Sequence, residues 1–370
     1  MGNWGGLVAQ ASTQYGLFTN DQAAAHGLGR MALCRAARAK QCERVLPGVY
    51  RLPTAPSAPG TPSSWAFRQR LLAACLWAGP DAVVSHAGAA RLYGLDGFDA
   101  DVVEVSVPRR MRRPSNVTRI AMARVTGTDR RLVNGIPVTS VARTLLDIAA
   151  DLTVAKFAQP LDAAWRRMLI RLDYLEHRLK SRALRGRAGL ETARRALRDC
   201  HLRGRPLGSI LEVRTWYLLR AAELPLPCCG LVFEPLEGQP GSIDLAYPEH
   251  SLAIECDGYG VHALTRDQFE ATERRASQLT ALGWRVQRIT KGMLDREPGK
   301  VVDRVWRAIA TPRVVWRPPP GVESWRQSGR SGIAESSWRN SRAPKGSGKE
   351  RRTGGGGNGR KTSMEAGRFR

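Results

Sequence analysis

The sequence predicts an α/β multidomain protein, and three observations lead to this prediction. The chain has 370 residues, enough for two or three domains, and 42% of them are apolar, which suffices for folded cores. Residues 8–52 show two short helical segments followed by two short strand-like segments. Residues 206–310 alternate helical and strand-like segments in an order that predicts a mixed sheet with flanking helices.

The N-terminal pattern predicts a winged helix-turn-helix over residues 1–52. The segment Phe18-Thr19-Asn20-Asp21 begins the first helix, with Thr19 or Asn20 as its cap. A second helix follows from Met31, and the stretch from Arg44 to Leu52 forms two short strands around Pro47-Gly48. Helix, tight turn, helix and hairpin is the order of elements in a winged helix-turn-helix.

The second helix of this unit is strongly basic. Its cations suit contact with phosphates in or beside a major groove, so we expect nucleic acid to bind here. The alternative is a small basic scaffold that binds no DNA. The expected contacts are Arg30, Arg35, Arg38 and Lys40.

The remaining domain boundaries are predicted from changes in composition and from residues that interrupt helices and strands. A Pro/Ser linker is expected at 53–64, a middle α/β domain at 65–172, a basic helical connector at 173–205, an α/β unit at 206–310 and a disordered basic tail at 311–370. In the middle domain, Arg109 and Arg110 lie in a basic loop and are further candidates for nucleic-acid contact. For the lone His86 we favour a local role in capping or hydrogen bonding over catalysis.

The net charge of +25 predicts attraction to nucleic acid or to an anionic membrane surface. The tail from Thr311 carries 14 Lys and Arg against 4 Glu, so the folded part still has +15. No apolar stretch is long enough to span a bilayer, and no secretory signal is evident. The seven cysteines lack zinc-ligand spacing and indicate reduced thiols. We therefore expect a cytoplasmic protein with no membrane partner, and its Ala, Arg and Gly usage favours a bacterium.

An acidic cluster interrupts this basic chain at Asp244, Glu255 and Asp257. The segments Ile243–Tyr247 and Ser251–Asp257 predict a hairpin that brings Asp244 close to Glu255. Acidic side chains on apolar strands are costly unless their desolvation is offset, and convergent carboxylates are good Mg²⁺ ligands. The sequence predicts a Mg²⁺ site at Asp244 and Glu255, with Glu212 of the preceding helix as a third acidic group.

A Glu on a helix, an Asp on a strand and a Glu on the next strand form an order that resembles the PD-(D/E)XK endonuclease superfamily. The closer resemblance is to its Vsr-like members, the domain of unknown function 559. It is carried by Ser209-Ile210-Leu211-Glu212, Ile243-Asp244-Leu245-Ala246-Tyr247-Pro248-Glu249, Glu255-Cys256-Asp257-Gly258, His262, Phe269, Arg275, Leu279, Gly283-Trp284 and Val286-Gln287-Arg288-Ile289-Thr290.

This resemblance implies a restriction-endonuclease-like sheet that hydrolyses DNA phosphodiester bonds with Mg²⁺. Asp244 and Glu255 would be metal ligands, supported by Glu212 and Asp257. His262 would be an acid/base or phosphate contact and Arg275 a phosphate or transition-state contact. The sequence departs from the family at Asp257, where the superfamily has Lys, and at Thr272, where an acidic residue is frequent.

The N-terminal half resembles AbiEi-family antitoxins of type IV toxin–antitoxin systems. The winged-helix likeness rests on Thr19-Asn20-Asp21-Gln22-Ala23, His26-Gly27-Leu28 and Pro47-Gly48-Val49-Tyr50-Arg51. The likeness of the following segment rests on Ser85-His86, Ala89-Ala90, Leu92-Tyr93-Gly94-Leu95, Val105-Ser106-Val107-Pro108, Gly135-Ile136-Pro137-Val138-Thr139-Ser140 and Arg143-Thr144-Leu145-Leu146-Asp147. The resemblance implies an operator-binding head and a cognate toxin as a partner.

Together these patterns lead us to expect a DNA-binding, Mg²⁺-dependent endonuclease acting in defence or repair. The alternative is an AbiEi-like antitoxin and transcriptional autoregulator whose nuclease fold is inactive. An RNA target also stays open, because basic charge does not distinguish RNA from DNA.

Overall fold

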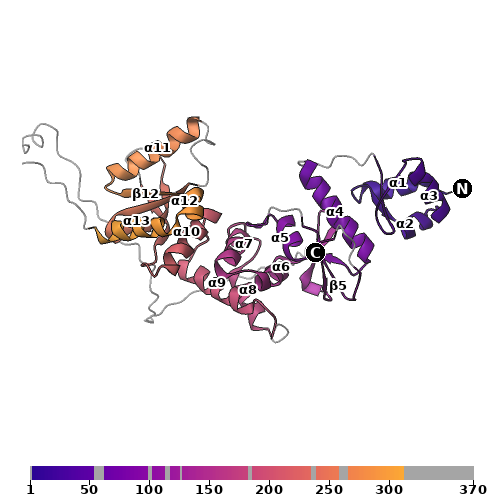
Figure 1. Ribbon diagram of the computed structural model, residues 1–370, viewed down its shortest axis with the longest axis horizontal. Coiled ribbons are helices and arrows are strands. Elements are labelled where there is room, and N and C mark those ends of the chain that lie inside the picture. Colours follow the sequence, from indigo (N-terminus) through magenta and orange to yellow (C-terminus); the bar gives the residue numbers. More distant parts are fainter. Residues whose placement is uncertain are drawn as a thin grey trace, which may run out of the picture. The chain divides into compact units, whose positions relative to one another are not determined.

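The computed structural model describes residues 2–53, 62–98, 102–112, 117–125, 127–181, 186–234, 239–257 and 266–311, all within the unit Met1–Arg313. Most of the predicted linker, His262 and the tail after residue 311 lie outside the described residues. Three sheets and their covering helices make up the described part, which confirms the α/β prediction (Figure 1). Within the described residues, no helix combines the length and apolar character that crossing a membrane requires.

The N-terminal head contains the predicted helix-turn-helix and hairpin. Its elements are α1 (Trp4–Ser12), β1 (Leu17–Thr19), α2 (Asn20–Ala25), α3 (Arg30–Arg38), β2 (Glu43–Leu46) and β3 (Val49–Arg51). The strands pair antiparallel in the order β1-β3-β2. Phe18 lies in β1 and not in the first predicted helix, because its ring stacks on Tyr50 of β3 at 5.6 Å between centroids.

Thr19 is the N-cap of α2, where the sequence predicted either Thr19 or Asn20. Its hydroxyl accepts a hydrogen bond from the backbone N–H of Gln22 at 3.2 Å, and the Gln22 side chain accepts one from the N–H of Thr19 at 2.9 Å. This reciprocal capping box satisfies two backbone donors that the first turn leaves free.

The middle domain has a five-stranded sheet in the order β6-β5-β4-β8-β7. Its elements up to the sheet's last strand are α4 (Pro62–Ala78), β4 (Val83–Val84), α5 (His86–Leu92), β5 (Glu104–Val107), β6 (Arg119–Met122), β7 (Arg130–Val133) and β8 (Ile136–Thr139). The pairs β4–β8 and β5–β6 are parallel, whereas β4–β5 and β7–β8 are antiparallel.

The head and the middle domain share one hydrophobic core. Leu17, Leu46 and Val49 of the head pack with Phe67 and Leu71 of α4 and with the buried side of the five-stranded sheet. The hydroxyl of Tyr15 donates a hydrogen bond to the Asn134 carbonyl in the β7–β8 turn, at 2.8 Å. The head is therefore packed onto the middle domain through α4.

A helical layer follows the sheet. It consists of α6 (Val141–Ile148), α7 (Val154–Arg166), α8 (Leu172–Lys180) and α9 (Leu190–Arg203). The segment predicted as a basic helical connector, residues 173–205, contains most of α8 and all of α9. Gly189 precedes α9 at φ +80°, and a Cβ there would lie 2.4 Å from the carbonyl carbon of Ala149. Only glycine fits this left-handed position and close approach.

The last sheet is mixed, as predicted, in the order β12-β11-β10-β9. Its unit consists of α10 (Ile210–Ala221), β9 (Cys228–Phe233), β10 (Gly241–Tyr247), β11 (Leu252–Asp257), α11 (Arg266–Ala281), β12 (Arg285–Thr290), α12 (Lys291–Arg296) and α13 (Pro298–Ala310). The strands β9, β10 and β11 pair antiparallel, and β11 pairs parallel with β12. The pairing of Leu245 with Ile254 places Asp244 beside Glu255, which confirms the predicted hairpin register.

Candidate functional site

The helix α3 presents a basic face to solvent. Leu33 and Ala36 are buried in the core of the head, so the opposite side of the helix is exposed. That side carries the predicted cations Arg30, Arg35 and Arg38. Among the described residues none of these three guanidinium groups pairs with a carboxylate, and α3 itself contains no acidic residue.

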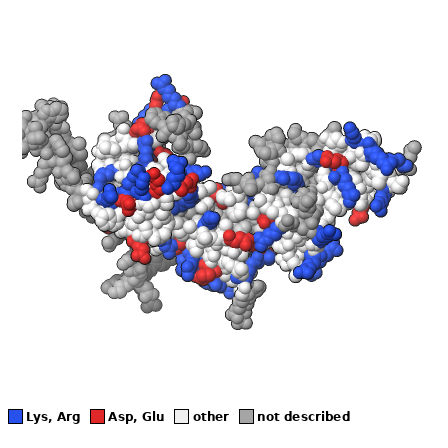
Figure 2. All heavy atoms as spheres, in the orientation of Figure 1, with Lys and Arg blue, Asp and Glu red and all other residues white. Residues whose placement is uncertain are grey.

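Further cations continue this surface. Lys40 is exposed just after α3, and Figure 2 shows Lys and Arg outnumbering Asp and Glu on the visible face of the head. Arg109 and Arg110 are exposed after β5, at the same edge of the middle sheet as the β7–β8 turn. That turn receives the hydrogen bond from Tyr15 of the head. The fold thus brings the two predicted groups of cations to neighbouring parts of the molecule.

The predicted metal ligands are engaged by protein donors. Asp244 Oδ2 accepts a hydrogen bond from the Cys256 backbone N–H at 2.8 Å. Arg275 donates two hydrogen bonds to the Glu255 carboxylate, from Nε to Oε2 at 3.0 Å and from Nη2 to Oε1 at 3.3 Å. Glu212 Oε2 accepts the Gly208 N–H at 2.8 Å, at the N-terminus of α10.

Burial has the largest effect on the pKa values of Asp244 and Glu255 in this acidic cluster. Desolvation raises the pKa of Asp244 from 3.8 to about 7, against the lowering effect of the Cys256 N–H. Desolvation also raises the pKa of Glu255, although Arg275 opposes it. Arg275 additionally contacts the Ser242 carbonyl and lies 5.6 Å from the centroid of the Phe233 ring. It is therefore a structural clamp on β10 and β11.

The structure does not assemble the whole predicted catalytic set. Asp257 ends β11 opposite Thr290, and His262 lies outside the described residues. Among the described residues, no three His, Cys, Asp or Glu side chains gather in a way that could hold a metal ion. The Mg²⁺ site at Asp244 and Glu255 stays a prediction.

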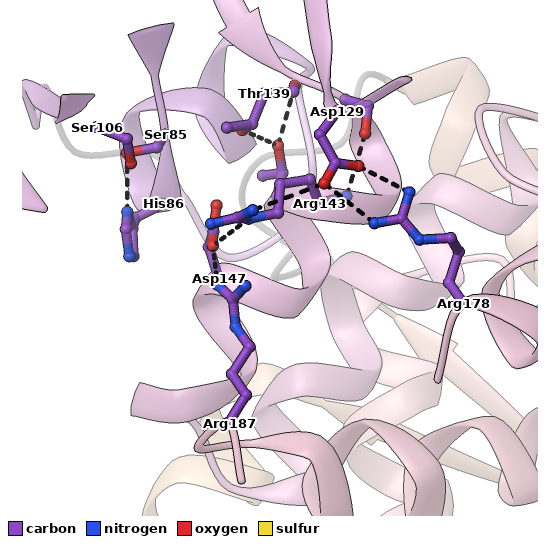
Figure 3. Close-up of polar contacts among 11 residues, drawn as sticks. Ser85, His86, Ser106, Asp129, Thr139, Arg143, Asp147, Arg178 and Arg187 are labelled. Carbon is purple, nitrogen blue, oxygen red and sulfur yellow. Dashed lines mark hydrogen bonds and ion pairs between the residues drawn. The ribbon is translucent and has the colours of Figure 1, made fainter. Parts of the chain in front are cut away.

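A second polar network lies in the middle domain, and its role was not predicted (Figure 3). Both Nη atoms of Arg178, in α8, donate hydrogen bonds to the Asp129 carboxylate, at 2.7 and 3.1 Å. Arg143 of α6 lies 3.6 Å from the same carboxylate and donates from Nε to Asp147 at 2.9 Å. Arg187 also contacts Asp147. The i,i+4 spacing of Arg143 and Asp147 was the one signal of this network in the sequence.

His86 has the predicted local role. Its Nδ1 lies 2.9 Å from the Ser85 hydroxyl, which in turn accepts a hydrogen bond from Ser106 at 2.9 Å (Figure 3). Burial lowers the pKa of the imidazole, which favours its neutral form.

Comparison with known proteins identifies the N-terminal half. A family model described as a transcriptional regulator, AbiEi antitoxin, matches residues 7–53. The model of the AbiEi antitoxin C-terminal domain matches residues 81–198. These matches confirm the predicted AbiEi resemblance and cover the head and most of the middle domain.

Two curated relatives come from Mycobacterium tuberculosis strains, the uncharacterized proteins MT2308 and Rv2248. Each is 29% identical over 245 residues, which are 66% of this chain and 88% of the relative. The crystal structure of the RV2827C protein from Mycobacterium tuberculosis aligns with 61% of this chain and 82% of its own, at 17% identity and a TM-score of 0.34.

The prediction of an endonuclease is wrong. The matched models describe an antitoxin and transcriptional regulator, and they support the alternative interpretation of the sequence. The carboxylates that suggested metal-dependent hydrolysis are instead engaged by backbone N–H groups and by Arg275. Family models thus find an N-terminal and a C-terminal AbiEi antitoxin domain in this chain, and no match supports a Vsr-like nuclease domain.

Proposed function

We propose that the chain is an AbiEi-like antitoxin and transcriptional autoregulator whose head binds operator DNA. The observation that carries this proposal is the solvent face of α3, where Arg30, Arg35 and Arg38 have no carboxylate partner among the described residues. In a winged helix-turn-helix the second helix enters the major groove, where free guanidinium groups reach phosphates and guanine edges.

The loop after β5 extends this interface in our proposal. Arg109 and Arg110 are exposed at the sheet edge that receives Tyr15 of the head. Because the two parts share a core, contacts by this loop would add to those of α3 on one duplex. Such contacts act on the DNA backbone and position the head without reading sequence.

The unit formed by α10 to α13 has a structural role in this proposal. It contains a mixed four-stranded sheet with flanking helices, and its acidic side chains contact β10, β11 and the N-terminus of α10. A cognate toxin is the second proposed partner, as the family resemblance implies.

The test is DNA binding by the full chain to a duplex from its own promoter region. We expect the double variant Arg35→Ala/Arg38→Ala to bind this duplex at least about tenfold more weakly, because two phosphate or base contacts are lost. The slope of log affinity against log salt concentration should fall by about 2, since each phosphate contact contributes about 0.9. Fluorescence anisotropy across a salt series measures both quantities.

Arg195→Ala/Arg198→Ala is the matched control. These two arginines lie on the exposed face of α9 and already pair with Glu191 at 3.1 Å, so their loss should leave DNA affinity unchanged. A matched RNA duplex should bind more weakly, because its deep, narrow major groove does not admit α3. Equal affinities of the wild type and the α3 variant would refute the proposed interface.

A further inference from the structure

A groove of about 750 Å³ opens on the middle domain. One wall is β7, the edge strand of the five-stranded sheet, and the other consists of the α7–α8 connector and α8. Its main lining residues are Leu132, Val141, Met168, Leu169, Tyr174 and His177. None of them belongs to the surface proposed to bind DNA.

The groove exposes large apolar side chains. Met168 is 91% exposed and Leu132 is 70% exposed, while Tyr174 and Leu169 are 42% and 38% exposed. Single exposed apolar residues are ordinary, but a group of them around one groove indicates an interaction site.

The backbone at Met168 supports the same conclusion. Met168 follows the last turn of α7 at φ +53°, and its N–H donates a hydrogen bond to the Trp165 carbonyl at 2.9 Å. This left-handed position after a helix is usually glycine, because a side chain there is strained. The chain therefore has backbone strain at a residue whose side chain is 91% exposed, and such strain is frequent at binding sites.

The two walls are fixed relative to each other. The pair between Arg178 and Asp129 joins α8 to the turn that begins β7, and both side chains are 17% exposed (Figure 3). Arg143 braces the same carboxylate from α6, which forms the floor. A groove held open by such a network needs little reorganisation on binding, which favours affinity.

The rim of the groove is basic. Arg131 donates to the Arg130 carbonyl and has no carboxylate partner among the described residues. Arg171 pairs with Asp173, the one acidic residue of the lining. The lining thus has two guanidinium groups against one carboxylate, and that carboxylate is already paired with Arg171, so the complementary ligand of Arg131 is acidic.

We propose that this groove binds an acidic protein segment that inserts apolar side chains between β7 and α8. The apolar walls anchor the inserted side chains, and Arg131 selects acidic neighbours. Nucleic acid fits less well, because the most exposed groups of the walls, Met168 and Leu132, offer nothing to a phosphate backbone. The inference does not depend on DNA binding by the head.

A selection with a random peptide library tests the proposal directly. The library is displayed against the full chain and depleted against the Met168→Asp variant. We expect the enriched peptides to be rich in Asp and Glu around Leu, Phe or Trp anchors. A synthetic copy of an enriched peptide should then bind Met168→Asp and Arg131→Glu at least about tenfold more weakly than wild type in fluorescence anisotropy.

Met122→Asp is the matched control. Met122 is 69% exposed on β6, at the opposite edge of the same sheet, so its replacement should leave peptide affinity unchanged. The thermal unfolding temperature of each variant shows that it is folded.

Four outcomes would overturn the proposal. Enriched peptides could be neutral or basic, or could bind Met168→Asp as well as wild type. Sedimentation could show a wild-type dimer that Met168→Asp abolishes, which would make the occupant a second copy of the chain. Finally, Met168→Asp could weaken promoter DNA binding as strongly as the α3 variant, which would make the groove a nucleic-acid surface.

Discussion

Replacing Asp162 with Ala is expected to destabilise the fold by about 3–5 kcal/mol, because the change leaves a buried guanidinium without its carboxylate. Asp162 of α7 and Arg203 of α9 lie 2.8 Å apart, and their side chains are 0% and 1% exposed. Asp162 also accepts the Leu207 N–H at 3.2 Å, and Arg203 lies 5.2 Å from the centroid of the Trp216 ring. The pair therefore joins α7, α9 and α10. Urea unfolding followed by circular dichroism measures the loss.

An exposed ion pair provides the control for this experiment. Arg171 and Asp173 are 83% and 64% exposed, so Asp173→Ala should leave the free energy of unfolding almost unchanged, because solvent screens an exposed ion pair. The double variant Asp162→Ala/Arg203→Met should be more stable than Asp162→Ala alone, because it no longer buries an unpaired charge. A loss in Asp162→Ala no larger than in Asp173→Ala would show that the buried pair contributes little.

The second large effect is a pH dependence centred on Asp244. Its folded-state pKa of about 7 lies above the ordinary 3.8, so folding favours the protonated carboxyl. The resulting stabilisation is complete below about pH 4 and is lost as the pH rises through 7. Three units of pKa correspond to at most about 4 kcal/mol of stability. Wild type should therefore lose stability between pH 4 and 8.

Asp244→Asn should flatten this profile. The amide oxygen can still accept the Cys256 N–H but carries no charge to desolvate, so the variant should exceed wild type in stability at pH 8. Urea unfolding at half-unit intervals of pH measures the difference. Glu249→Gln, in the exposed turn before β11, serves as the control and should follow the wild-type profile. Parallel profiles of wild type and Asp244→Asn would refute the assignment.

Local patterns predicted much of the fold. The Thr19 cap, the Pro47-Gly48 hairpin and the pairing register of β10 with β11 all depend on neighbours within a few residues. Short-range hydrogen bonds and the two-residue period of strands determine such features, so these features can be predicted from a sequence. The strand β1 was missed because it is only three residues long and is stabilised by pairing with the distant β3.

The partners of the acidic site residues were not predicted, for a physical reason. Two carboxylates that converge across a hairpin can bind either a divalent cation or an arginine side chain. The spacing of Asp244 and Glu255 does not distinguish these two partners. Glu255 is occupied by Arg275, twenty residues further along the chain, which becomes its partner only once α11 packs beside β11. The network of Arg143 and Arg178 around Asp129 likewise forms only after α8 folds back onto η1 (Gly127–Asp129).

The sequence by itself determined the order of elements, the basic face of α3 and the likeness to AbiEi antitoxins, because these rest on residue type and short spacing. Only the tertiary structure decided what each buried charge touches. Desolvation and pairing depend on which distant side chains share a low-dielectric interior. For this reason the contacts of the acidic cluster with the Cys256 N–H and with Arg275 could not be predicted from the sequence. The groove beside Met168, built from β7, α6 and α8, could not be predicted either.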